Sequence, residues 1–356
     1  MGLPACGPGA TDLTYDSSSP QPDSGTQPDA AQPQDSAANP DGGAAIPDGR
    51  PAEPGKPDGG RLLVGYYQSW SDSWQSSGAN TALAKLPAYV NVVNLAFMKP
   101  DATYQKGSLS LVGTGLDFPY DGPTLRDAIA ALHQKNPGTR VLVSVGGATY
   151  WNWDGYVPTA IADFVADFGL DGVDLDYEPT AAACTSNGTT VTCPSDAQFA
   201  SVVRSTRAQL SAGRWLSIAA WSVGAYGEGE WANALPESGF RGIALAVLKD
   251  ATTSAAIDLV NVMSYDAGAD YSPTEALRAY QHYFRGRIAL GVEVPPEAWG
   301  GHVATLEEID SLASAVVGSG AAGMMLWSIQ KQGPAQPFAT RLCQNLGLGG
   351  CSEPML

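Results

Sequence analysis

Residues 171 to 178 read Asp-Gly-Val-Asp-Leu-Asp-Tyr-Glu, and this is the most informative stretch of the sequence. Asp174, Asp176 and Glu178 recur at every second position of an apolar segment, and on a β-strand such residues share one face. Burying three like charges side by side is costly, and the usual outcome is shared protons and coupled titrations. The alternative is a solvated acidic strand edge in which only the intervening residues are buried. We interpret the stretch as a carboxylate relay that ends in an acid, Glu178.

The composition of the chain changes near position 60. Residues 1 to 60 contain 11 of the 26 prolines and almost no large aliphatic side chains. Such a segment cannot bury enough apolar surface to offset its ordering entropy, so we expect a disordered tether. Residues 61 to 345 have the right length for one α/β barrel, and a short tail over 346 to 356 follows.

Charge and hydropathy exclude several classes of partner. The net charge of −17 argues against nucleic acid, because binding to phosphates needs a basic surface. The sequence has no run of eighteen apolar residues, so no helix is expected to span a membrane. We expect the chain to act as a monomer.

From residue 61 onward, short runs rich in β-branched residues alternate with segments of helical period, a pattern typical of repeated βα units around a parallel sheet. The predicted strands are Leu62 to Tyr67, Val90 to Phe97, Arg140 to Val145, Gly172 to Glu178, Trp215 to Trp221, Leu259 to Tyr265, Arg287 to Val294 and Gly323 to Ser328. The predicted helices include Thr124 to His133, Thr159 to Phe168, Gln198 to Leu210, Thr274 to Phe284 and Leu306 to Val317. Eight strands with intervening helices predict a (β/α)8 TIM barrel.

Four segments carry a resemblance to a known family. They are the acidic stretch, Ser-Val-Gly-Gly at 144 to 147, Met-Ser-Tyr-Asp at 263 to 266, and Gly-Met-Met-Leu-Trp-Ser at 323 to 328. In this order they resemble family 18 glycoside hydrolases, the chitinases and their endo-β-N-acetylglucosaminidase relatives, over roughly Arg61 to Cys343. The resemblance implies the same barrel and a retaining mechanism in which the substrate's own N-acetyl group is the nucleophile.

The resemblance also implies roles for the acidic residues. Glu178 would be the general acid and base, Asp176 would orient the acetamido group, Asp174 would share a proton with Asp176, and Tyr265 would donate to the acetamido oxygen. The i, i+2 spacing agrees, since it places Asp176 and Glu178 roughly 6–7 Å apart along one face rather than across a sugar from each other. The neighbouring carboxylate and the closed site would raise the pKa of Glu178. Asp171 lies off that face, and we expect a structural role for it.

Active sites of such barrels lie at the carboxyl ends of the strands. The substrate-binding residues predicted there are Tyr66, Phe97, Gly147, Trp221, Met263, Asp266 and Trp327. Seven of the nine tryptophans, at positions 70, 74, 151, 153, 221, 299 and 327, lie at strand ends or in the loops beyond, which suits stacking on sugar rings. The three histidines are scattered, so we expect no metal site and no cofactor.

The positions of the five cysteines divide them into two local pairs and one single residue. Cys184 and Cys193 flank a polar loop after the acidic strand, and Cys343 and Cys351 flank the Gly-rich tail. Two local disulfides imply an oxidising, extracytoplasmic compartment, with the protein secreted or anchored at the cell surface. Cys6, in Leu-Pro-Ala-Cys-Gly, resembles the acylated cysteine of a bacterial lipoprotein, although only five residues precede it.

The leading function hypothesis is hydrolysis of β-1,4 bonds in chitin or chitooligosaccharides. An endo-β-N-acetylglucosaminidase acting on N-glycans and a peptidoglycan glucosaminidase share the same acids, and the sequence does not separate them. A non-catalytic, chitin-binding lectin is the alternative outside the enzymes. Such relatives usually lose the last glutamate of the acidic stretch, and Glu178 is present.

Overall fold

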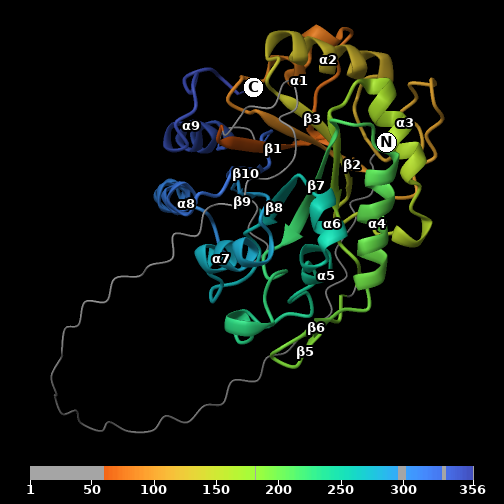
Figure 1. Ribbon diagram of the computed structural model, residues 1–356. Coiled ribbons are helices and arrows are strands. Elements are labelled where there is room, and N and C mark those ends of the chain that lie inside the picture. The colour runs from red at the N-terminus through yellow and green to blue at the C-terminus, as the bar shows by residue number, and fades with distance from the viewer. Residues whose placement is uncertain (1–59, 181, 296–301, 331–333, 356) are drawn as a thin grey trace, which may run out of the picture. The chain divides into compact units, whose positions relative to one another are not determined.

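The computed structural model describes residues 60–180, 182–295, 302–330 and 334–355. Eight parallel strands close into a barrel in the order β1-β10-β9-β8-β7-β4-β3-β2, with helices around the outside (Figure 1). The barrel strands are β1 Leu62–Gln68, β2 Val92–Met98, β3 Arg140–Gly146, β4 Gly172–Asp176, β7 Trp215–Trp221, β8 Leu259–Met263, β9 Arg287–Glu293 and β10 Gly323–Trp327. The predicted fold is confirmed. The predicted tether over residues 1 to 60 lies outside the described residues, apart from Gly60.

Helices follow most of the strands, and several begin at an N-cap side chain or end at a glycine. They are α1 Ala82–Lys85, α2 Gly122–Lys135, α3 Pro158–Phe168, α4 Asp196–Gln209, α5 Leu245–Lys249, α6 Ala251–Ala256, α7 Pro273–Tyr283, α8 Leu306–Ser319 and α9 Ala335–Asn345. A capping box of Thr305 and Glu308 starts α8, because each side chain bonds the other's backbone N–H. Gly320 ends that helix in the left-handed conformation.

Two apolar clusters hold the barrel together. The larger one lies between the sheet and the helices, and the smaller one fills the barrel interior. Alternation along each strand separates the two, since successive side chains point to opposite faces. At one end of the interior, Trp215 is buried, with the guanidinium carbons of Arg140 and Arg287 lying 4.6 and 5.3 Å from its ring centroid.

A short hairpin of β5 Thr185–Ser186 and β6 Val191–Thr192 lies in the connection between β4 and α4. The sequence did not predict it, because strands of two residues show no periodicity. Predicted β4 and β8 are also each two residues too long. Pro179 lacks the N–H that a central strand needs, and Ser264 already closes a turn onto Val262.

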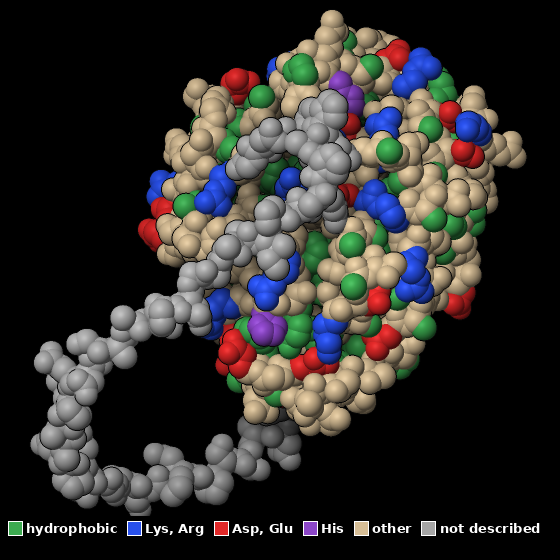
Figure 2. Space-filling model, in the orientation of Figure 1, with side chains coloured by type: hydrophobic (Ala, Val, Ile, Leu, Met, Phe, Trp, Pro, Cys, Tyr) green, Lys and Arg blue, Asp and Glu red, His purple; other side chains and the backbone are tan. Residues whose placement is uncertain are grey.

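On the face of the molecule in Figure 2, lysine and arginine side chains are interspersed with aspartate and glutamate side chains. The described residues include no helix long and apolar enough to cross a membrane.

Candidate active site

A cavity of about 470 Å3 lies at the carboxyl ends of the strands. Its lining comes from several strand ends and from the loops beyond them: Gln68, Trp70, Phe97, Ala148, Thr149, Asp176, Glu178, Trp221, Ser222, Met263, Tyr265, Asp266 and Trp327. This is the end of the barrel at which parallel strands of this fold present functional side chains.

Asp174 is fully buried inside the barrel, below the cavity. Its carboxylate accepts hydrogen bonds from the hydroxyls of Tyr66 and Ser144, both at 2.8 Å, from the hydroxyl of Ser217, and from the amide of Asn261 at 3.2 Å. Burial raises the pKa of Asp174, and the four donors act in the opposite direction. The carboxylate is therefore held by donors on all sides.

Asp176 and Glu178 are joined by a hydrogen bond in the cavity. Burial raises the pKa of Asp176 well above its ordinary value, and the charges of Glu178 and Asp174 add to the effect. Oδ1 of Asp176 is buried and has no hydrogen-bond partner among the described residues. A buried carboxylate oxygen of this kind is ready to accept a bond from a ligand N–H.

Burial raises the pKa of Glu178 to about 7. The hydrogen bond with Asp176 lowers this pKa and the charge of Asp266 raises it, and the value of about 7 includes both effects. The expected direction of the shift is confirmed, but the expected cause was wrong in part. The neighbouring carboxylate stabilises the charged form of Glu178 through its hydrogen bond, and desolvation is the main reason that this acid holds its proton near neutral pH.

Tyr265 and Asp266 follow β8, which only β7 separates from β4 in the barrel, and they line the same cavity as Asp176 and Glu178. Burial, and then the charges of Asp176 and Glu178, raise the pKa of Tyr265 well above its ordinary value, so its hydroxyl stays protonated and can donate. Asp266 has a φ of 55°, in the left-handed region that residues other than glycine rarely adopt. Such strain is typical of functional sites.

The floor of the cavity is aromatic. The rings of Trp327 and Phe97 stack with centroids 5.6 Å apart, and Trp70 lies 6.0 Å from Phe97. Tyr66 lies beneath them, 5.8 Å from Trp327, and Gly147 packs against the ring of Phe97, where a Cβ would approach to 2.8 Å. The cavity thus combines a near-neutral acid, a second carboxylate, a phenol and a flat apolar floor, which suits acid-base chemistry on a cyclic polar ligand.

The model of the family described as glycosyl hydrolases family 18 matches residues 62–284 of this sequence. The chain belongs to family 18 of the glycosyl hydrolases.

Family 18 relatives share parts of this sequence or its fold. A chitinase of Plasmodium falciparum is 32% identical over 139 residues, which is 36% of this chain and 35% of that protein, so the chain spans about a third of that relative. The solved family 18 chitinase of Chromobacterium violaceum is 18% identical, with a TM-score of 0.59 over 81% of this chain and 83% of its own. Human YKL-39 is 12% identical, with a TM-score of 0.56 over 81% of this chain and 100% of its own, and is described as a pseudo-chitinase with retained chitooligosaccharide binding.

Most predicted residues of this family 18 site lie at the cavity. Glu178, Asp176, Tyr265, Phe97, Trp221, Met263, Asp266 and Trp327 line it. Asp174, Tyr66 and Gly147 are not in the lining and lie in the layer below. Among the tryptophans, Trp153 is buried against Tyr177, and Trp299 lies outside the described residues.

Sequence reasoning missed Gln68, Ala148, Thr149 and Ser222, which also line the cavity. Gln68 and Ser222 directly follow predicted strands, and Ala148 and Thr149 lie three and four residues after one, so position alone could have found them. It also missed Phe240, whose ring stacks on Trp221 with centroids 3.8 Å apart. No local signal marks this contact, because nineteen positions separate the two residues in the chain.

Asp171, expected to be structural, lies at the start of β4. Its carboxylate accepts a hydrogen bond from the backbone N–H of Val141 at 2.8 Å and lies 2.9 Å from Nε2 of His133. Arg140 and Arg214 are each 3.9 Å away. Asp171 thus links α2, β3 and the segment before β7. These contacts lie at the amino-terminal end of β4, whereas Glu178 follows its carboxyl end.

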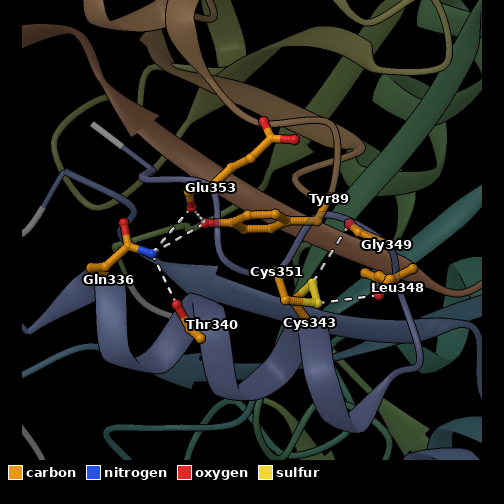
Figure 3. The surroundings of a disulfide bond; sticks show 8 residues. All are labelled: Tyr89, Gln336, Thr340, Cys343, Leu348, Gly349, Cys351 and Glu353. Atoms are coloured by element: carbon orange, nitrogen blue, oxygen red, sulfur yellow. Dashed lines mark hydrogen bonds between the residues drawn. A yellow bond between two sulfur atoms is a disulfide. The ribbon is translucent and has the colours of Figure 1, made fainter.

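Both predicted disulfides are present. Cys184–Cys193 closes the hairpin connection after β4, and Cys343–Cys351 joins α9 to the tail. Figure 3 shows the second bond beside Tyr89, whose hydroxyl bonds the backbone oxygen of Glu353 at 3.1 Å. Cys6 lies outside the described residues, and within the described ranges no cluster of His, Cys, Asp and Glu could hold a metal ion.

Proposed function

We propose that this protein hydrolyses β-1,4 bonds between N-acetylglucosamine units of chitin or chitooligosaccharides, with retention of configuration. The observation that carries the proposal is Glu178, which lies in the cavity with a pKa raised to about 7 and a hydrogen bond to Asp176. An acid of this kind can donate a proton near neutral pH and then act as a base.

In the proposed first step, Glu178 donates its proton to the glycosidic oxygen as the bond from that oxygen to the anomeric carbon breaks. The acetamido carbonyl oxygen of the same sugar forms a bond to the anomeric carbon, which gives an oxazolinium ion. Asp176 accepts a hydrogen bond from the acetamido N–H and stabilises the positive charge. Tyr265 donates to the acetamido oxygen, and Asp174 stabilises the relay from below.

In the second step, the Glu178 carboxylate takes a proton from a water molecule. The water oxygen bonds to the anomeric carbon from the face that the leaving group occupied, and the acetamido group is released. Because the carbon is inverted twice, the product starts as the β anomer. The aromatic floor of Trp327 and Phe97 supports the sugar ring at the cleavage site.

Incubation with chitooligosaccharides and, separately, with a high-mannose glycoprotein tests the substrate, with mass spectrometry of both reactions. Shortened oligosaccharides are expected from the first. Proton NMR of fresh product should show the β anomer first, and a thiazoline mimic of the oxazolinium ion should inhibit. An initial α product would rule out the mechanism.

The same experiment separates the alternatives. Release of glycan from the glycoprotein alone would indicate an endo-β-N-acetylglucosaminidase. In a third incubation, with peptidoglycan, cleavage of that polymer alone would indicate a cell-wall glucosaminidase. Binding of chitooligosaccharides without any cleavage would indicate a lectin of the kind that the description of YKL-39 names. The presence of Glu178 favours the enzyme.

We also propose an extracytoplasmic, monomeric protein, secreted or anchored through an acylated Cys6. Two disulfides favour an oxidising compartment. If Cys6 is acylated, the native protein should partition into the detergent phase, and Cys6→Ala should abolish this behaviour. A native form that stays in the aqueous phase would refute the anchor.

A further inference from the structure

Trp221 ends β7 and lines the active-site cavity, and the contacts that hold its backbone differ from those that hold its ring. Its backbone oxygen accepts hydrogen bonds from the hydroxyl of Tyr280 at 2.6 Å and from the backbone N–H of Gly224 at 2.8 Å. Its indole Nε1 is buried and has no hydrogen-bond partner among the described residues. The orientation of the ring therefore depends on packing rather than on a hydrogen bond.

Phe240 supplies this packing. Its ring stacks on the indole with centroids 3.8 Å apart and an angle of 14° between the two planes. Residues 222 to 244 leave β7 and fold back on themselves, so that the backbone N–H of Gly242 donates to the backbone oxygen of Val223 at 3.1 Å. The fold of this loop thus returns Phe240 to the residue from which the loop starts.

The connection after β4 holds the loop on both sides of Phe240. The backbone N–H of Cys184, which forms the disulfide of this connection, donates to the backbone oxygen of Gly239 at 2.9 Å. On the other side, Gly242 has a φ of 83°, and a Cβ there would approach the side chain of Val191 to 2.6 Å. The disulfide-bonded hairpin therefore contacts the chain both before and after Phe240.

We propose that Phe240 is a positioning residue that holds the indole of Trp221 at the cavity, and that the disulfide-bonded connection after β4 acts on ligand affinity through it. The ligand class, an oligosaccharide of N-acetylglucosamine, rests on the proposed function. Phe240 does not line the cavity, so it acts on a ligand by way of Trp221. Loss of its ring should weaken binding and leave the chemistry at Glu178 unchanged.

Fluorine NMR of protein labelled with 5-fluorotryptophan tests the positioning without any ligand. The resonance of Trp221 is the one that Trp221→Phe removes. In the Phe240→Ala protein this resonance should shift, because the ring current of the stacked phenyl group is lost. In Phe240→Tyr it should stay near its original position. An unchanged resonance in Phe240→Ala would overturn the positioning role.

Calorimetry measures the consequence for the ligand. In a Glu178→Gln background, Phe240→Ala should weaken binding of chitooligosaccharides roughly two- to tenfold, the size expected for one lost aromatic contact, and Phe240→Tyr should restore it. With Glu178 intact, KM should rise by a similar factor while kcat changes little. Leu235→Ala is the matched control, because Leu235 belongs to the same loop, is 47% exposed and does not line the cavity. It should bind as the parent does.

The action of the disulfide is tested by a double-mutant cycle. Replacing Cys184 and Cys193 by serine should weaken binding, and in a Phe240→Ala background the same replacement should have little further effect, because both changes act on one contact. Additive effects would overturn the coupling, and equal affinities of the Phe240→Ala and parent proteins would overturn the effect on the ligand. If the parent binds no chitooligosaccharide while the fluorine resonance shifts as expected, the proposed function fails and the positioning of Trp221 stands.

Discussion

Glu178 and Asp176 have different surroundings, although one residue separates them. Asp176 is 3% exposed and keeps one buried oxygen without a partner among the described residues. Glu178 lies closer to the cavity mouth, where the charge of Asp266 also reaches it. Asp176 is placed to receive a ligand N–H, and Glu178 to exchange a proton with a leaving group or with water.

Glu178→Gln should lower the hydrolysis rate by roughly 10²–10⁴-fold, because the amide keeps the shape of the side chain and cannot donate the proton. Binding of chitooligosaccharides should persist, and Asp176→Asn should also be severely impaired. Rates and calorimetric affinities measure both effects. Glu230→Gln, a change at an exposed glutamate outside the cavity lining, should behave as wild type. Wild-type turnover in Glu178→Gln would end the assignment of the acid.

The raised pKa of Glu178 predicts the pH dependence of activity. The first step needs the protonated acid, so kcat/KM should fall as the pH rises through about 7. Stability should change in the same direction: folding raises this pKa, so the folded state binds the proton more tightly and loses stability as the pH rises from the unfolded value to about 7. Glu178→Gln removes this loss, so its Tm relative to wild type should be higher at pH 8 than at pH 5. An unchanged Tm difference between pH 5 and pH 8 would contradict the assignment.

At the scale of elements, the connection after β4 is fastened to the loop after β7. The disulfide Cys184–Cys193 closes the hairpin, and the backbone N–H of Val191 donates to the carboxylate of Glu228 at 2.6 Å. Glu228 is 4% exposed and also pairs with Lys249 at 2.6 Å. The hairpin is therefore held by its disulfide and by the hydrogen bond from Val191 to Glu228.

Replacing Cys184 and Cys193 together by serine should lower the free energy of unfolding by about 2–3 kcal/mol, because the unfolded chain regains the freedom of a closed loop. Urea unfolding measures the change, and non-reduced peptide mapping checks the bond. Replacing Cys343 and Cys351 by serine is the comparison, because that disulfide closes a loop of similar length (sequence separations of 8 and 9). Free thiols at 184 and 193 in protein made in an oxidising compartment would reject the bond.

Long, strongly patterned elements could be predicted from the sequence, and short ones could not. All eight barrel strands lie where β-branched runs predicted them, and Trp215–Trp221 has the predicted bounds. Helices α1, α5 and α6 have six residues or fewer, too few for an amphipathic period to show. At the site, motif residues were predictable, whereas Phe240 behind Trp221 depends on how a long loop folds back.

Across the whole molecule, the connections that follow β8 and β9 are short. Only residues 264 to 272 join β8 to α7, and residues 294 to 305 join β9 to α8. Neither segment is long enough for an added subdomain that would raise one wall of a groove. The described connections after β2 (residues 99 to 121), after β4 (residues 177 to 195, with the hairpin) and after β7 (residues 222 to 244) are longer.

We therefore expect a shallow, open groove with endo-type cutting and little processivity. The ratio of dimer to longer products from soluble chitin, followed from the first minutes, measures this property. Early release of oligomers of mixed length is the expected result. Dimer as nearly the sole early product would contradict the open groove.

The position of Asp174 bears on how this barrel could change its function. Its four hydrogen-bond donors come from β1, β3, β7 and β8, so one carboxylate links five strands across the interior. The carboxyl group that lies beneath Asp176 and Glu178 thus also links the strands of the barrel. Glu178 lies at the rim of the cavity and does not link the barrel strands in this way among the described residues. A protein evolved from this one could lose the proposed hydrolase activity by one substitution of Glu178 and keep both the barrel and the binding of sugars. Substitution of Asp174 would instead lower the stability of the barrel.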